Sequence, residues 1–200
     1  MAAGDRRLTR VVIRPLLSKP ATWIVVAVLG AGGAGALYWF QPWRLFTDTV
    51  ATDVLSVVPS AAPQPSGGSG TRPAVPASPA VIAQGSFVTQ EHDTSGSARM
   101  VRNPDGSHQL EIAGLDTSDG PDLRVWLSDQ KVRTGTAGWR VFDDGEYAEL
   151  GKLKGNHGDQ VFRLAPGVDP AAFQSVSIWC KRFAVSFGAA PLEPRPAGAA

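Results

Sequence analysis

The chain has 200 residues, of which 43% are apolar, and its formal net charge at pH 7 is +1. This composition excludes a chain that is disordered throughout. Residues 1–80 hold seven Lys or Arg and three Asp or Glu, whereas residues 81–200 hold twelve and fifteen. The sequence therefore predicts a basic leader and a mildly acidic domain. Such a domain is a poor candidate for nucleic-acid binding, which needs clustered cations.

The N-terminal region predicts a membrane anchor. Residues 1–20 are basic, and residues 21–40, ATWIVVAVLGAGGAGALYWF, carry no charge over the length that crosses a hydrocarbon core as a helix. Few basic residues follow, so the positive-inside rule predicts a cytoplasmic N-terminus and an exported C-terminal part. Ala34-Gly35-Ala36 leaves a cleaved signal peptide open as the alternative. The anchor predicts one partner, the lipid bilayer.

Two segments of different composition separate this helix from the domain. Residues 41–58 form a juxtamembrane segment whose ambiguous pattern allows a short amphipathic helix on the outer membrane surface. Residues 59–80 contain six prolines and cannot bury enough apolar surface to fold. We expect a disordered tether that reaches roughly 70 Å when extended, at about 3.3 Å per residue.

Residues 81–192 predict an all-β domain, a small sandwich or barrel, and residues 193–200 a disordered tail. Short segments of alternating apolar and polar residues are separated by turn signals, such as Asn103-Pro104-Asp105-Gly106. In PDLRVWLS (121–128), Trp126 lies on the face opposite Leu123, Val125 and Leu127. Asp169 and Pro170 predict the start of one helical turn.

Cys180 is the only cysteine, so the domain contains no internal disulfide. Strand alternation places Cys180 on one face with Val176 and Ile178, and Trp179 on the other. Three interpretations remain open: a buried core residue, a reactive thiol whose thiolate Arg182 favours, and a ligand or intermolecular disulfide.

Other chemical signals are weak. The glycines of GAGGAG (30–35) lie inside the expected membrane helix, so they do not predict a dinucleotide site. The three histidines lack zinc-ligand spacing, and we expect no metal site. The sequence shows no motif that pairs a nucleophile with a general base, so it does not predict an independent enzyme. Trp126, Trp139 and Trp179 are compatible with stacking on a sugar or haem, but packing in the core or on a sheet face explains them better.

Four segments resemble the DM13 domain: GSFVTQEHDTSGSARMV (85–101), GPDLRVWLS (120–128), YAELGKLKGNHGDQVFRL (147–164) and SVSIWCKRFAVSFGAAPL (175–192). The resemblance implies a membrane-tethered or extracytoplasmic domain that takes part in electron transfer. It also implies that Cys180 is the redox centre, with Trp179 as its neighbour.

Two functions remain as hypotheses. The first is a redox module in which Cys180 exchanges electrons with an unidentified partner, supported by Trp179 and Arg182. The cofactor is unknown, and haem ligation has no motif to support it. The second is a cell-envelope binding or scaffolding module in which Cys180 is only a core residue.

Overall fold

A computed structural model describes residues 19–58 and 78–195 of the protein. The basic segment 1–18, most of the expected tether and the end of the tail lie outside these residues. Helix α2 (Pro20–Phe40) forms a compact unit of its own. Pro20 occupies the first turn, where a missing N–H is tolerated. The helix is long and apolar enough to cross a membrane, as the sequence predicts.

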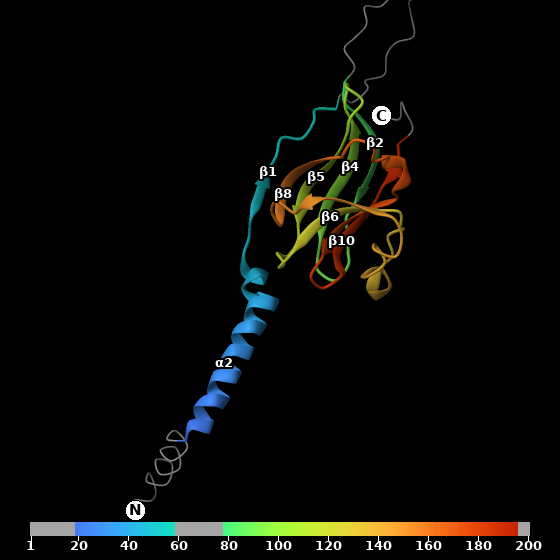
Figure 1. Ribbon diagram of the computed structural model, residues 1–200. Coiled ribbons are helices and arrows are strands. Elements are labelled where there is room, and N and C mark those ends of the chain that lie inside the picture. Colours follow the sequence, from blue (N-terminus) through green and yellow to red (C-terminus); the bar gives the residue numbers. More distant parts are fainter. Residues whose placement is uncertain (1–18, 59–77, 196–200) are drawn as a thin grey trace, which may run out of the picture. The chain divides into compact units, whose positions relative to one another are not determined.

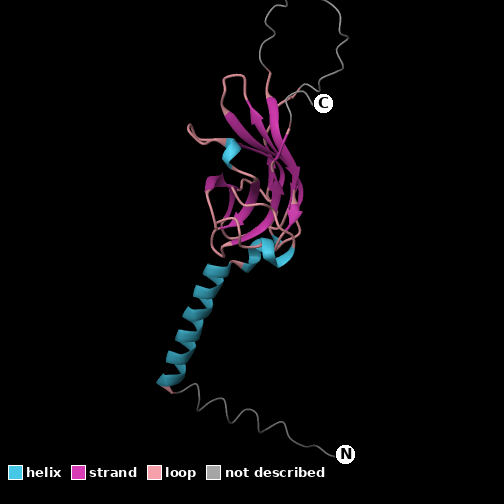
Figure 2. Ribbon diagram, turned by 90° about the vertical axis from the view of Figure 1, so that its right-hand side faces the viewer, coloured by secondary structure: helices cyan, strands magenta, loops and turns pink. Residues whose placement is uncertain are grey.

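The second unit is a β-sandwich of two sheets, which confirms the predicted fold class (Figures 1 and 2). The first sheet has the strand order β1 (Val50–Thr52), β8 (His157–Arg163), β5 (His108–Asp116), β4 (Ser95–Arg102), β2 (Ala80–Ser86) and β11 (Glu193–Pro194). The second sheet has the order β3 (Val88–Thr89), β10 (Val185–Pro191), β9 (Ser175–Cys180), β6 (Leu123–Ser128) and β7 (Tyr147–Lys152). The short 3-10 helices are η1 (Pro42–Phe46), η2 (Gly135–Gly138) and η3 (Pro170–Ala172).

The main core lies between the two sheets and follows the predicted alternation. Val176, Ile178 and Cys180 of β9 belong to it, together with Leu123 and Val125 of β6. The expected N-cap at η3 is also present, since the carboxylate of Asp169 accepts a hydrogen bond from the backbone of Ala171. Local periodicity thus assigns these side chains to the correct face of their strands.

A second, smaller core covers the outer face of the second sheet. Trp126 and Trp179 pack there against Val141 and Phe142, which come from the loop between β6 and β7. Because this loop closes the outer face, all six residues of β9 are buried. A strand buried on both faces shows no polar side, which explains why the sequence SVSIWC contains only small hydroxyls besides apolar residues.

The juxtamembrane segment belongs to the sandwich, which differs from the expected domain start at residue 81. Strand β1 pairs in parallel with β8 and becomes the edge of the first sheet (Figure 1). The backbone N–H of Asp53 donates to Asp159 O at 3.0 Å, and that of Ser56 donates to the carboxylate of Glu111 at 2.9 Å. Strand β1 occupies the region where the sequence pattern allows an amphipathic helix. Without β1, strand β8 would be the edge of the sheet and its outer backbone groups would be unpaired. Strand β1, which is distant in sequence, forms hydrogen bonds with these groups.

The Pro-rich stretch therefore follows a segment that already belongs to the domain. Ser56 and Ala80, on either side of residues 59–77, both contact the first sheet. The sequence predicts that residues 41–58 and 59–80 both separate the membrane helix from the domain, and this connectivity differs from that expectation. The chain from the end of α2 to the first residue of β1 comprises only residues 41–49.

Candidate functional site

Cys180 lies at the end of β9, with none of its surface exposed to solvent. It belongs to the main core and pairs with Val185 across the turn between β9 and β10. Ala184 takes a left-handed conformation in this turn, with φ of 49°. The face predicted from alternation is correct, and the burial places the sulfur out of reach of solvent in this conformation.

Burial raises the pKa of the Cys180 thiol, because a thiolate is poorly solvated in an apolar core. The backbone N–H groups of Phe183, Arg182 and Asp122 oppose this effect but do not outweigh it. The backbone N–H of Arg182 is thus one of the groups that lower the pKa of the thiol, whereas the sequence predicts an effect of its side-chain charge. At neutral pH the thiol is protonated, so it is a weak nucleophile.

Trp179, the neighbour of Cys180 in the sequence, points to the opposite face of β9. Its ring stacks on Trp126 of β6, with centroids 5.0 Å apart and an interplanar angle of 22°. Trp126 in turn stacks on Tyr147 of β7 at 4.1 Å and 8°. Trp179 and Trp126 are 1% and 4% exposed, whereas Tyr147 is 49% exposed. We call these three residues the aromatic stack. It leads from the interior of the second sheet to its edge.

A carboxylate lies beside the middle ring of the aromatic stack. Glu149 pairs with Trp126 across β6 and β7 and accepts a hydrogen bond from the indole N–H at 3.3 Å. Arg124 and Lys181 form ion pairs with the same carboxylate at 2.8 and 3.1 Å. Burial alone would raise the pKa of Glu149, but Lys181 and Arg124 outweigh it and lower that pKa.

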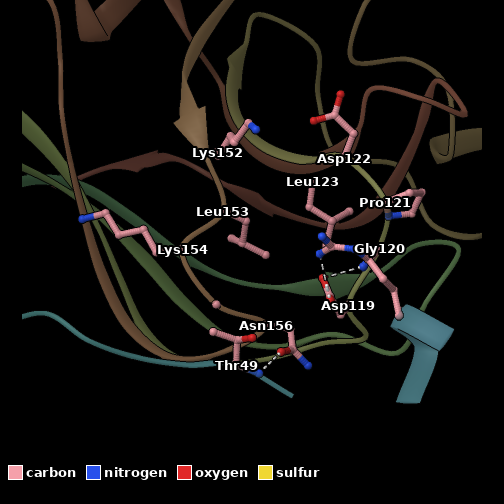
Figure 3. Close-up of a pocket in the computed structure, with 12 residues that line it drawn as sticks. Thr49, Asp119, Gly120, Pro121, Asp122, Leu123, Lys152, Leu153, Lys154 and Asn156 are labelled. Atoms are coloured by element: carbon pink, nitrogen blue, oxygen red, sulfur yellow. Dashed lines mark hydrogen bonds and ion pairs between the residues drawn. The ribbon is translucent and has the colours of Figure 1, made fainter. Parts of the chain in front are cut away.

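A polar cavity of about 140 Å³ lies where the juxtamembrane segment meets the sandwich (Figure 3). Most of the charged side chains that line it already form ion pairs within the protein. Arg44 forms an ion pair with Asp119 at 3.2 Å, and the backbone of Thr49 donates to the Asn156 side chain at 2.7 Å. Lys154, which extends away from Asp119 in Figure 3, pairs with Asp53. The cavity is thus a mainly polar seam between docked parts of the chain, and Pro121, Leu123 and Leu153 supply its small apolar lining.

His92 and His157, which lack zinc-ligand spacing in the sequence, both have structural contacts. His92 stacks on Phe187 with ring centroids 3.8 Å apart, and burial lowers its pKa. His157 lies between Asp48 and Asp116, at 3.0 and 3.1 Å. Within residues 19–58 and 78–195, no group of three His, Cys, Asp or Glu side chains has the arrangement of a metal site.

Tyr147 and Glu149 are not identified as site residues by the sequence alone. They lie in DDGEYAE (143–149), which resembles an acidic surface loop, and their partners are more than twenty residues away. Alternation in YAELGK places both residues on one face of a strand. That local signal does not identify β6 as the neighbouring strand.

Comparison with protein families identifies a match. The family model described as "Electron transfer DM13" matches residues 86–192, which is more than half of the chain. The searches of curated proteins and of solved structures found no match. The matched range includes the whole aromatic stack, Glu149 and Cys180, and it begins after the juxtamembrane strand β1.

Proposed function

Since the chain belongs to the DM13 family, we propose that it is a membrane-tethered electron-transfer module. Helix α2 anchors it, and the sandwich lies outside the cytoplasm. The basic residues that precede the helix support this orientation, because positive charge is retained on the cytoplasmic side. Exposed thiols are oxidised in that compartment, and burial in the core shields the Cys180 sulfur from direct oxidation.

We propose Cys180 as the redox residue, with Trp179 as the group next to it on the electron path. The observation that carries the proposal is the aromatic stack, which runs from Trp179, the sequence neighbour of Cys180 on the opposite face of β9, to Tyr147 at the surface. A partner that docks at Tyr147 exchanges electrons with the interior without touching the sulfur. Thiol–disulfide exchange, by contrast, would require opening of the turn between β9 and β10, because attack needs direct access to the sulfur.

Electron counting tests this function. The full chain in detergent is titrated with an outer-sphere metal complex as oxidant and then with a matching reductant, and Cys180→Ala is treated identically. We expect the native sequence to release and recover electrons reversibly, and Cys180→Ala to exchange fewer electrons while it still unfolds cooperatively. Equal exchange by both proteins would contradict the role of Cys180. No exchange by the native sequence would contradict electron transfer.

The complete burial of Cys180 favours a second candidate function, the envelope binding or scaffolding module. In that case the thiol only fills space in the core, and replacing it lowers stability without a redox effect. Cys180→Ala removes a small buried group and would cost on the order of 1–2 kcal/mol of unfolding free energy. The two candidates therefore differ in the electron count, while both predict some loss of stability.

A further inference from the structure

We propose that Trp126 is a redox-active residue of this domain, with Tyr147 as its contact to the surface and Glu149 as the acceptor of its indole proton. This inference rests on the proposed electron-transfer function and adds a site to it. Oxidation of the Trp126 indole does not require the Cys180 thiol, so the two proposed redox roles are independent.

The position of the ring is the first support for this role. Trp126 lies between an exposed tyrosine and a buried tryptophan, with nearly parallel contacts on both sides. Overlapping π systems at these distances couple electronically, so an electron that leaves the interior passes through Trp126. The ring itself is 4% exposed, which protects an oxidised state from water.

The hydrogen bond to Glu149 is the second support. Oxidation by one electron leaves a positive charge on a nearly buried indole, and an uncompensated buried charge is unfavourable. The indole N–H of Trp126 points at a carboxylate 3.3 Å away. Transfer of that proton leaves a neutral ring, so the electron and the proton leave the same residue by different routes.

The step balances without a further reactant inside the domain. A strong one-electron oxidant at the surface, such as a high-potential metal complex, takes one electron through Tyr147. The N–H bond of Trp126 breaks, an O–H bond forms on Glu149, and a neutral tryptophanyl radical remains. One electron from a donor, with return of the proton from Glu149, restores the starting state.

Charged groups also hold the proton acceptor in place. Arg124 of β6 and Lys181 of the turn after β9 both bind Glu149, and Arg124 also pairs with Asp122 at 2.8 Å. These cations lower the pKa of Glu149, which leaves the carboxylate ionised and able to take a proton, although as a weaker base than a free glutamate. They also fix the carboxylate beside the indole. An exposed ion pair alone would contribute little to stability, so the convergence of three donors on one carboxylate is better explained as positioning.

A photo-oxidant attached near Tyr147 tests the proposal on the full chain in detergent. Glu146 is exposed and precedes Tyr147, so Glu146→Cys provides the attachment point for a ruthenium photosensitiser. Cys180 stays unlabelled in the folded protein because it is buried. After a flash and an external electron acceptor, transient absorption and electron paramagnetic resonance identify the amino-acid radical and its protonation state.

We expect a neutral tryptophanyl radical in the native background and its loss in Trp126→Phe. Trp139→Phe is the matched control, because the indole N–H of Trp139 has no hydrogen-bond partner among the described residues and its ring is outside the stack. The control should leave the radical unchanged. Glu149→Gln keeps an acceptor oxygen but is a much weaker base, so the radical should remain in its protonated, cationic form.

A second measurement does not depend on the folding of any of these variants. In the labelled protein with Trp126 and Glu149 intact, radical formation in D₂O should be slower than in H₂O if the indole proton moves with the electron. A radical that persists in Trp126→Phe, or a neutral radical with unchanged kinetics in Glu149→Gln, would overturn the proposal. If no tryptophanyl radical forms but Cys180 still exchanges electrons in the titration, only the proposed role of Trp126 is refuted. If the tryptophanyl radical forms but Cys180→Ala exchanges as many electrons as the native sequence, only the proposed role of Cys180 is refuted.

Discussion

The docking of the juxtamembrane strand depends on Gly158, in the segment GNHGDQ. Gly158 has a φ of +92°, and a Cβ at this position would overlap the carbonyl oxygen of Ala51 in β1. Gly167 has nearly the same φ, +89°, and a Cβ added there would meet no atom within 4 Å. Gly158→Ala and Gly167→Ala therefore carry similar backbone strain, and only the first also collides with β1.

The expected difference in stability follows from the contacts of residues 49–56. A left-handed alanine costs about 1 kcal/mol in either variant. Eight hydrogen bonds hold the segment through Thr49, Asp53 and Ser56, and each contributes about 0.5–1.5 kcal/mol. Release of the segment recovers part of this as backbone entropy. We expect Gly158→Ala to lose about 2 kcal/mol more unfolding free energy than Gly167→Ala.

Urea unfolding of the full chain in detergent measures the difference, and hydrogen exchange locates it. In Gly158→Ala, the amides of Thr49, Asp53 and Ser56 should exchange faster, while those in β9 should keep their protection. Equal stability losses in the two variants, with the segment still protected in both, would refute the reasoning that β1 needs a glycine opposite Ala51.

Two further predictions concern the thiol and the carboxylates of the docked segment. Alkylation of Cys180 in the folded full chain should be slow at neutral pH and become fast only on denaturation, because the thiol is buried and burial raises its pKa; rapid labelling with a low pH midpoint would contradict the observed burial. Protection of residues 49–56 from hydrogen exchange should fall as the pH drops below about 4, the ordinary range of carboxyl pKa values. His157 and Asn156 lower the pKa of Asp48, and Lys154 lowers that of Asp53. For Glu111, burial raises the pKa, but hydrogen bonds from Ser56 and Arg99 outweigh it and lower the value. Groups with lowered pKa values stabilise the docked state above their unfolded pKa, and this stabilisation disappears as they are protonated; protection that is unchanged at pH 3 would show that these carboxylates do not hold the segment.

Several features of the protein can be predicted from local sequence patterns. An uncharged run of twenty residues predicts helix α2, because a bilayer-spanning helix needs that length. Alternation with a period of two assigns Cys180 and Trp179 to opposite faces of β9, and the structure confirms this assignment. The family resemblance, carried by short motifs, is also visible in the sequence.

Three other features depend on which strands become neighbours. The pairing of β1 with β8 joins residues 107 positions apart, such as Val50 and His157. The aromatic stack combines one residue from each of β7, β6 and β9, and the burial of Cys180 requires the facing sheet. A strand's own sequence specifies its two faces, because side chains alternate along it. It does not specify the strand beside it, because backbone hydrogen bonds are the same for every residue; the packing of the whole sandwich makes that choice.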